Sequence, residues 1–137
     1  MSELKELAAE AKHELLTHII PFWRGMRDDK FGGYYGYLSY DLALDEKAEK
    51  GCILNSRITW FFANAYLLYK DGGISEEECE AAGFKGEDLL AEAKHGYEFL
   101  RDHCIDKEYG GIFWSLNYDG TPLDTTKHTY NQAFCIY

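Results

Sequence analysis

Arg57 stands at the edge of a long uncharged stretch of sequence. From Ile58 to Tyr69 no side chain carries a charge, and apolar or aromatic residues occupy every face that a helix would present. A helix of this kind is enclosed by protein on all sides, and an arginine is almost never fully buried without a partner. Two interpretations are open: Arg57 forms an ion pair with an outer helix, or its guanidinium faces a pocket and meets a ligand.

The other candidate residues suit the recognition of a sugar. The C–H faces of a sugar pack on aromatic rings, while its hydroxyl groups seek a few fixed polar partners. Helix N-termini add unsatisfied N–H groups, which favour a developing negative charge on oxygen. Besides Arg57, the residues expected around such a site are Trp60, Trp114, Lys127, His128, Tyr130 and Asn131.

Each of these residues also has a purely structural explanation. His128 can bond its own loop, Lys127 can be solvated, and Trp114 can pack within its loop. The sequence contains no nucleophile triad, no phosphate-binding P-loop and no dinucleotide fingerprint.

Two kinds of helix alternate along the chain: amphipathic helices with one polar face, and helices that are apolar all round. Pro21 ends the first amphipathic helix, and Ser75 with Glu78 forms the capping-box pattern of a short surface helix. The expected order is an amphipathic helix at 2–20, a Gly-Gly turn and hairpin at 31–41, an apolar helix at 52–69, the surface helix from 75, an amphipathic helix at 87–104, a second Gly-Gly loop at 109–116 and an apolar helix from about 127.

The two halves of the chain repeat one unit. AEAKH at 9–13 recurs at 91–95, FGGYYGYL at 31–38 matches YGGIFWSL at 109–116, and SRITWFFANAY at 56–66 matches KHTYNQAFCIY at 127–137. This alignment places Arg57 opposite His128, both in the first turn of an apolar helix. A two-layered ring with amphipathic helices outside and apolar helices inside satisfies both patterns, so the sequence predicts an all-α fold of the α/α toroid type.

The predicted domain is a partial one. It spans residues 1–137 as two helix-hairpin repeats, at about 2–70 and 85–137. Two hairpins do not close a circle, and the second apolar helix stops at Tyr137 without a cap or a polar tail. We therefore expect the N-terminal part of a larger toroid, with its inner helices exposed to an abnormal extent.

Composition and charge narrow the possible partners. A formal net charge of −10 without a Lys/Arg cluster argues against nucleic acid and membrane as partners, and leaves a small neutral molecule such as a sugar. The N-terminus lacks the pattern of a secretory signal and no apolar run is long enough to span a bilayer, so a cytoplasmic location is expected. Cysteines at 52, 79, 104 and 135 lack metal-ligand spacing, so we expect small core residues, with neither a metal site nor disulfides. The oligomeric state is left open.

Five segments resemble one known family in its own order. They are HIIPFW at 18–23, GGYYGYLSYD at 32–41, L-x-SRI-x-WF at 54–61, DKEYGGIFWSL at 106–116 and KHTYNQAFCIY at 127–137. Together they resemble the start of the N-acylglucosamine 2-epimerase family, and within it the branch that acts on β-1,4-linked disaccharides such as cellobiose.

The resemblance implies an (α/α)6 barrel, of which these residues form about the first third, and a cofactor-independent epimerisation at C2 of a reducing-end aldose. In that reaction the sugar ring opens, a histidine base removes the C2 proton, a cis-enediolate forms and a proton returns on the other face. Arg57 matches the family's arginine that binds a substrate oxygen and stabilises the enediolate. Trp114, Tyr130 and Asn131 fall where the family lines its pocket.

Two features depart from the family pattern. Asn55 stands where the family often has histidine before the Ser-Arg pair. The family's base and acid histidines belong to later inner helices, so the 137-residue chain alone is expected to be inactive.

Other functions remain open at this point. The same chemistry suits N-acetylglucosamine, or free mannose in an aldose–ketose isomerisation. Glycoside hydrolysis needs two carboxylates, for which only Asp41, Asp45 or Asp124 lie near the expected mouth of the ring. A non-catalytic sugar-binding or interaction module is the alternative of another class.

Overall fold

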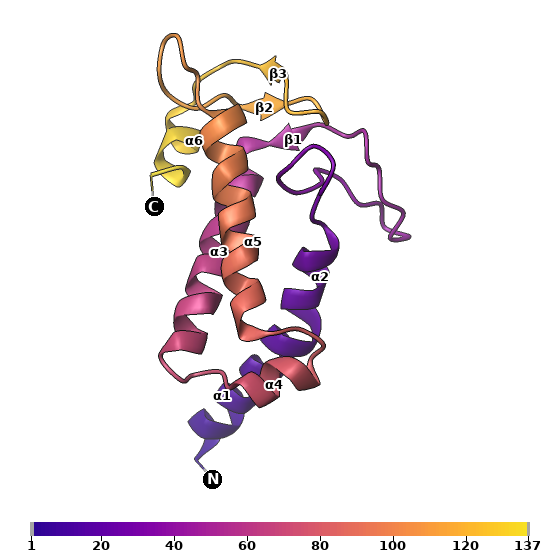
Figure 1. The fold of residues 1–137 in the computed structure, drawn as a ribbon, viewed down its shortest axis with the longest axis vertical. Helices are drawn as coiled ribbons and strands as arrows, with labels where there is room; N and C mark the ends of the chain where they lie inside the picture. The colour runs from indigo at the N-terminus through magenta and orange to yellow at the C-terminus, as the bar shows by residue number, and fades with distance from the viewer. Residues whose placement is uncertain (1, 137) are drawn as a thin grey trace.

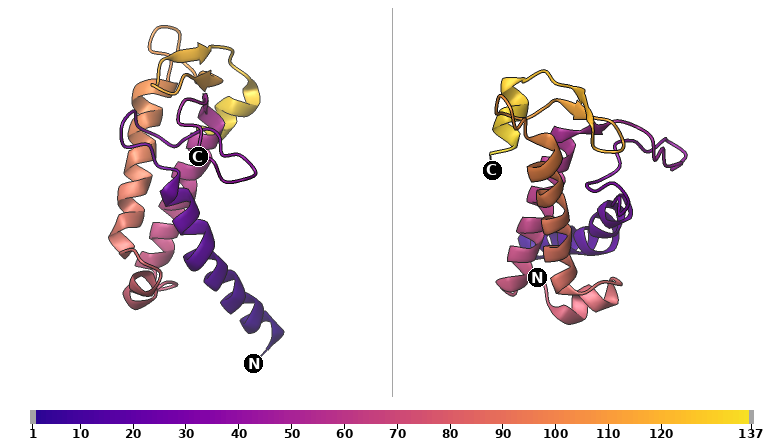
Figure 2. Two further views of the ribbon diagram at one scale, coloured as in Figure 1. Left: turned by 90° about the vertical axis from the view of Figure 1, so that its right-hand side faces the viewer. Right: turned by 45° about the horizontal axis from the view of Figure 1, so that its top comes forward.

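The computed structural model describes residues 2–136, and its first helix is longer than the sequence predicts. α1 (Glu3–Glu14), the π-helical turn η1 (Leu15–Ile19) and α2 (Ile20–Gly25) follow without a break, and Figure 2 shows them as one rod whose N-terminal end projects from the molecule. The prediction that Pro21 ends this helix is wrong. Pro21 lies in the first turn of α2, where a missing N–H costs least, and the wider π turn before it shifts the hydrogen-bond register.

Two long helices form the centre of the fold. α3 (Cys52–Lys70) lies beside α5 (Gly86–Phe99), which the π-helical η2 (Leu100–Cys104) extends (Figure 1). Gly96 permits their close approach, because a Cβ at this position would lie 2.2 Å from Thr59 Oγ1. The predicted helices at 52–69 and 87–104 are confirmed. The main core includes the fully buried side chains of Ile20, Tyr34, Phe62 and Leu89.

The short surface helix α4 (Glu76–Ala81) connects α3 to α5, as predicted. Its capping box is complete, since Ser75 Oγ accepts from the Glu78 N–H at 3.2 Å and the Glu78 carboxylate accepts from the Ser75 N–H at 2.8 Å. Ile74 and Phe84 are buried on either side of this helix, so the connection closes one end of the main core.

A small antiparallel sheet lies at the opposite end of the α3–α5 pair (Figure 1). Its strands are β1 (Lys50–Gly51), β2 (Ser115–Leu116) and β3 (Pro122–Asp124), in that order. β1 runs directly into α3, and β3 leads to the short helix α6 (Thr129–Phe134). The sheet therefore joins the second Gly-Gly loop to the beginning of α3.

The two Gly-Gly loops are built alike. In the first, the Asp28 carboxylate accepts hydrogen bonds from the N–H groups of Lys30 and Phe31 and pairs with Lys50 Nζ at 2.6 Å. The second loop repeats these bonds at Asp106, with the partners Glu108, Tyr109 and Lys127. The glycines at 32–33 and 110–111 all have positive φ, a conformation that a Cβ disfavours.

Polar side chains of the inner helices hold both loops in the same way. Asn55 Oδ1 accepts a hydrogen bond from the Tyr34 N–H at 2.9 Å, and Gln132 Oε1 accepts one from the Ile112 N–H at 2.8 Å. Asn55 in α3 and Gln132 in α6 are thus equivalent positions. Asn55, the departure from the family pattern, has a structural role here.

These contacts correct the register of the repeat. Gly51 and His128 are the N-caps of α3 and α6 and share one extended backbone conformation, with φ −71° and ψ 130° against φ −73° and ψ 132°. The prediction that Arg57 corresponds to His128 is therefore wrong, because His128 corresponds to Gly51 and Arg57 to Phe134. Two apolar helix sequences can be aligned in several registers, whereas the hydrogen bonds from each helix to its loop allow only one. α6 is also shorter than the predicted segment 127–137.

A smaller core lies beneath the sheet. It consists of the buried residues Cys52, Phe99, Cys104 and Leu116. Cys79 is buried in the main core and Cys135 is half-buried, and the four cysteines are free thiols. The prediction that the cysteines are small core residues is confirmed for Cys52, Cys79 and Cys104.

One face of α3 is open, although the helix is apolar all round. Trp60, Leu67 and Leu68 are 48%, 56% and 41% exposed. The abnormal exposure expected of an inner helix in a partial toroid is thus confirmed, and full enclosure by protein is not found within residues 2–136. None of the described helices combines the length and apolar character needed to cross a membrane.

Candidate functional site

An open pocket of about 870 Å³ lies along the first three turns of α3. Its walls come from α2, the end of β1, α3 and the residue before β2, and they are mainly aromatic and aliphatic. The lining residues are Trp23, Gly51, Ile53, Leu54, Arg57, Ile58, Trp60, Phe61 and Trp114.

A second compartment of about 270 Å³ adjoins this pocket. The two share Trp114 and the residues at the start of α3, and the smaller one adds Gly36 and Glu49. Glu49 Oε2 accepts a hydrogen bond from Ser115 Oγ at 3.4 Å, which turns its carboxylate toward the sheet. Trp114 therefore stands between two connected compartments.

Arg57 lies in the second turn of α3 and lines the larger compartment. Within residues 2–136 its guanidinium makes no ion pair, and its identified neighbour is the ring of Phe134, whose centroid is 5.4 Å from Cζ. Of the two interpretations offered by the sequence, an ion pair with an outer helix is not found. Arg57 lines the pocket, and the N–H donors of a guanidinium suit an oxygen-rich ligand.

Trp114 is held by its backbone on both sides. Its N–H donates to the Asp124 carbonyl at 3.0 Å, and its carbonyl accepts from the Cys52 N–H at 3.1 Å. The indole is therefore placed relative to the first residue of α3, in the wall that the sequence analysis assigned to it.

His128 does not line the pocket. Its ring meets the indole of Trp114 at an angle of 60°, with the centroids 4.6 Å apart, and among the described residues it forms no hydrogen bond to its own loop. Its charge contributes, after the hydrogen bonds from Thr126, to lowering the pKa of the Asp124 carboxyl. His128 thus stands behind a pocket wall, a position that neither sequence-based interpretation anticipated.

The remaining candidates are held outside the pocket. Tyr130 is 60% exposed, with its ring 4.7 Å from that of Phe134. Asn131 is fully buried, and its Nδ2 donates to the Phe113 carbonyl at 2.6 Å. Lys127 pairs with Asp106 and lowers the pKa of that carboxyl to about 2. The structure therefore brings Arg57, Trp60 and Trp114 together and assigns Asn131 and Lys127 to the support of the second loop.

Sequence reasoning missed part of the lining. Trp23 reaches the pocket from the end of α2, and Ile53, Leu54 and Phe61 reach it from α3. Trp23 belongs to the HIIPFW segment, so its place in the family resemblance was an available signal. Leu54 and Phe61 likewise belong to the L-x-SRI-x-WF segment, but α3 is apolar on all its faces, so periodicity alone did not show which face lines the pocket.

Within residues 2–136, this wall contains a group that can stabilise negative charge but no histidine that could transfer a proton near neutral pH. Among the described residues, the two compartments are lined by the charged side chains Arg57 and Glu49 and by no imidazole. The guanidinium of Arg57 can stabilise negative charge on an oxygen. Proton transfer near neutral pH calls for a general base of matching pKa, and the lining does not contain a histidine for that purpose.

Known structures define the class of this fold. A crystal structure described as a sugar epimerase from a ruminal bacterium superposes with a TM-score of 0.82 at 51% sequence identity, covering 96% of this chain and 30% of that one. The predicted class, part of an α/α toroid, is thereby confirmed.

Sequence relatives identify the family. The family model of N-acylglucosamine 2-epimerase (GlcNAc 2-epimerase) matches residues 33–137. Cellobiose 2-epimerase of Ruminococcus albus is 51% identical over 131 residues, or 96% of this chain and 30% of the relative, and that of Eubacterium cellulosolvens is 53% identical over 124 residues, or 90% and 27%. The chain belongs to the N-acylglucosamine 2-epimerase family. It spans about 30% of the length of these curated relatives.

Proposed function

We propose that this protein serves as a carbohydrate 2-epimerase acting on the reducing-end aldose of a β-1,4-linked disaccharide such as cellobiose. The observation that carries the proposal is Arg57, which lines an aromatic pocket without an ion-pair partner in residues 2–136. The identity to two cellobiose 2-epimerases supports the choice of substrate.

In the proposed reaction, ring opening exposes a C1 aldehyde, which makes the C2 proton acidic. A base removes that proton, the charge moves to the carbonyl oxygen of a cis-enediolate, and a proton returns to the opposite face of C2. Arg57 stabilises the oxyanion, because its N–H donors carry a fixed positive charge that water does not fully screen in a pocket. The base and the acid are histidines outside this wall, as the family resemblance implies.

The aromatic residues account for binding of the sugar rings. Trp60, Trp23 and Trp114 offer faces against which the C–H side of a pyranose packs. The two compartments on either side of Trp114 accommodate two linked sugar units, with the reducing unit beside Arg57 and the second beside Glu49.

A chimera tests this proposal. The 131 residues of Ruminococcus albus cellobiose 2-epimerase that match this chain at 51% identity are replaced by the sequence described here. We expect the chimera to introduce deuterium at C2 and to form the C2 epimer when it is incubated with cellobiose in heavy water. A folded, soluble chimera without C2 exchange contradicts the proposal, and a ketose product assigns the chain to aldose–ketose isomerisation.

The 137-residue chain alone provides the complementary measurement. Because its pocket lining lacks an imidazole base, we expect no C2 exchange from this polypeptide. Measurable deuterium uptake at C2 would show that the proton-transferring group lies within these residues.

A further inference from the structure

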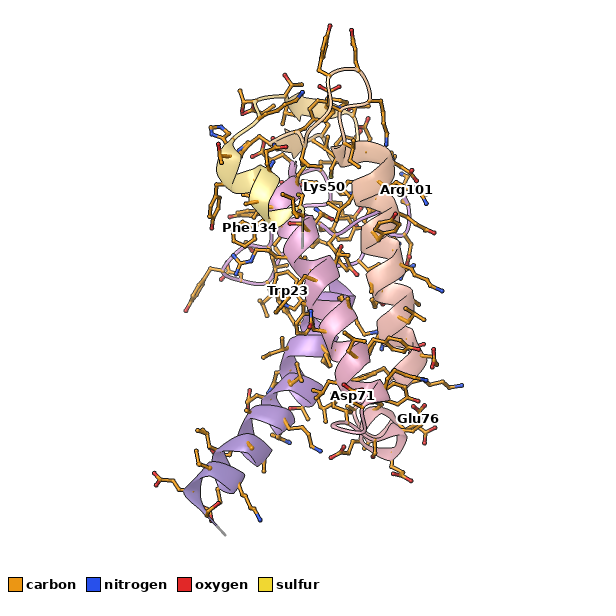
Figure 3. The ribbon with its side chains drawn as sticks, turned by 90° about the vertical axis from the view of Figure 1, so that its left-hand side faces the viewer. Trp23, Lys50, Asp71, Glu76, Arg101 and Phe134 are labelled. Atoms are coloured by element: carbon orange, nitrogen blue, oxygen red, sulfur yellow. The ribbon has the colours of Figure 1, made fainter. Side chains whose placement is uncertain are left out.

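α6 touches two sides of the pocket without lining it. At its N-cap the His128 ring meets the indole of Trp114, with a centroid separation of 4.6 Å. At its last residue the Phe134 ring lies 5.4 Å from the Arg57 guanidinium carbon. Figure 3 shows Phe134 on α6 beside the N-terminal half of α3, and it labels Trp23, which belongs to α2.

We propose that α6 is the positioning element of this pocket. Phe134 orients the guanidinium of Arg57, and His128 orients the indole of Trp114; both are positioning residues that do not touch the substrate. The part of the proposal that concerns sugar affinity rests on the proposed function, whereas the orientation of the two side chains does not.

Arg57 needs such support because of its length. An arginine side chain loses much of its rotamer freedom when it is ordered, and no carboxylate within residues 2–136 holds Arg57. The face of an aromatic ring attracts a guanidinium through the ring quadrupole, and it leaves the N–H groups at the guanidinium edge free for a ligand oxygen. An ion pair would order Arg57 but occupy those same donors.

Trp114 has a different need. Its backbone is fixed by Asp124 and Cys52, but hydrogen bonds of the backbone leave the side-chain torsions of the indole unrestrained. Trp114 is 37% exposed and lines both compartments. The His128 ring packs against the indole with the centroids 4.6 Å apart, and this contact restricts the side-chain torsions of Trp114.

α6 is itself anchored independently of the pocket. Asn131 Nδ2 donates to the Phe113 carbonyl at 2.6 Å, and Gln132 Nε2 donates to the Ile112 carbonyl at 2.7 Å. These bonds tie the middle of α6 to the second Gly-Gly loop. The two ends of the helix are then fixed relative to α3, which is the property that a positioning element requires.

The repeat gives the Arg57–Phe134 contact an additional meaning. The two residues occupy equivalent positions of successive units, as the matching loop anchors Asn55 and Gln132 establish. At this equivalent position, the first unit has Arg57 and the second has Phe134, which supports Arg57.

Four variants of the 137-residue chain test the proposal by NMR of the tryptophan indole and arginine Nε–H groups, without sugar. In His128→Ala we expect the order parameter of the Trp114 indole N–H to fall from about 0.85 to below about 0.6, and in His128→Phe to recover. In Phe134→Leu we expect the Arg57 Nε–H signal to lose its ring-current shift, and in Phe134→Trp to keep one.

Matched substitutions elsewhere provide the controls. His18→Ala changes an exposed histidine of η1, and Phe31→Leu changes a ring that packs on Tyr118. Neither should alter the Trp114 or Arg57 signals. Unchanged order parameters and shifts in His128→Ala and Phe134→Leu, with the backbone spectrum intact, would overturn the proposal, as would an equal change in the two controls.

A cellobiose titration of the same variants tests the consequence for binding. Loss of a cation–π contact at an exposed site corresponds to a roughly two- to fivefold weaker affinity in Phe134→Leu, with recovery in Phe134→Trp. If the wild-type chain shows no cellobiose-induced shift of Trp60 or Trp114, the proposed function loses its support while the positioning result stands. If cellobiose binds equally to all four variants, the positioning role in binding is wrong and the proposed function stands.

Discussion

At the scale of single residues, Arg57 is a cationic side chain that lines the larger compartment of the pocket. It has the donors that an enediolate oxygen requires, and no ion pair within residues 2–136 competes for them. Its described contact with the protein is the Phe134 ring, which leaves the N–H groups at the edge of the guanidinium available to a ligand.

Removing this charge should affect the reaction more than the fold. In the chimera, Arg57→Ala should lower the rate of C2 exchange by about 10²–10³-fold, the usual cost of losing one oxyanion donor. The exchange rate of Arg57→Lys should lie between that of the unsubstituted chimera and that of Arg57→Ala, because lysine keeps the positive charge but lacks the planar guanidinium. The Tm of the 137-residue chain should stay unchanged; a large fall in Tm would show that the role of Arg57 is structural.

Two equivalent lysines provide a prediction about stability. Lys50 is fully buried with Asp28, whereas the Lys127 side chain is 32% exposed beside Asp106. Lys50→Met should cost about 3–5 kcal/mol in the free energy of unfolding because it strands a buried carboxylate. Lys127→Met should cost less than Lys50→Met, because the Lys127 side chain is 32% exposed and water can solvate the carboxylate that remains. Urea unfolding measures both, and equal losses would contradict the difference in burial.

At the scale of elements, the fold depends on a few close approaches between helices. α3 and α5 meet at Gly96, where a methyl group would lie 2.2 Å from Thr59 Oγ1. At Gly25, at the end of α2, a Cβ would have no atom within 4 Å. The same substitution should therefore have opposite effects at these two helical positions.

Gly96→Ala should destabilise the chain by about 1–3 kcal/mol, the usual cost of inserting a methyl group into a packed interface. Gly25→Ala should leave stability unchanged or raise it by up to about 1 kcal/mol, because alanine favours the helix. Thermal unfolding of the two variants measures the contrast. A Gly96→Ala variant as stable as the unsubstituted chain would indicate that the α3–α5 interface tolerates separation.

The Gly-Gly loops should make stability depend on pH in acid. The pKa of Asp106 is lowered to about 2 by the hydrogen bond from Lys127 and by backbone N–H groups. At Asp28 burial raises the pKa, but the bonds from Lys50, Phe31 and Lys30 outweigh it and the net direction is downward.

A carboxyl whose pKa is lower in the folded state stabilises the fold above its unfolded pKa, and this contribution is lost as the pH falls through the folded pKa. For Asp106 the loss should occur from about pH 4 to about pH 2. Asp106→Asn should flatten the Tm profile in that range. A profile equally steep with and without Asp106 would show that this carboxylate is not a stabilising group.

At the scale of the whole molecule, the described residues expose more surface than a closed domain would. The accessible area is 8492 Å², against about 7,300 Å² for a folded monomer of 15.8 kDa. The excess includes apolar side chains on α1, where Leu4 and Leu7 are 77% and 60% exposed, and on the open face of α3. Exposed apolar faces of this kind are typical of surfaces that bind another protein segment.

The isolated 137-residue chain should therefore self-associate. Leu67→Gln combined with Leu68→Gln should shift it toward the monomer in sedimentation velocity, while Tm changes little because both side chains are exposed. Leu89→Gln, at a fully buried position, is the matched control and should lower Tm instead. Association that persists in the double variant would place the contact on another face, such as that of α1.

Most of the fold was accessible from sequence because its signals are local. The capping box at Ser75, the glycine pairs and the alternation of amphipathic and apolar helices each depend on neighbouring residues. The prediction that Pro21 ends the first helix was wrong because the helix continues through the π turn that precedes Pro21. That π turn has no sequence signature. The site was predictable only in part: Arg57, Trp60 and Trp114 were found, and Trp23 and the roles of α6 were not.

By itself, the sequence determined the helix types, the repeated unit and the family, because periodicity and motif order are properties of the chain. Tertiary structure alone decided the register of the repeat, since an apolar helix fits many registers until hydrogen bonds such as Tyr34–Asn55 and Ile112–Gln132 select one. It also decided that Arg57 rests on Phe134 and faces a pocket, and that His128 stands behind Trp114. Each of these contacts joins segments distant in the chain, and no local pattern encodes them.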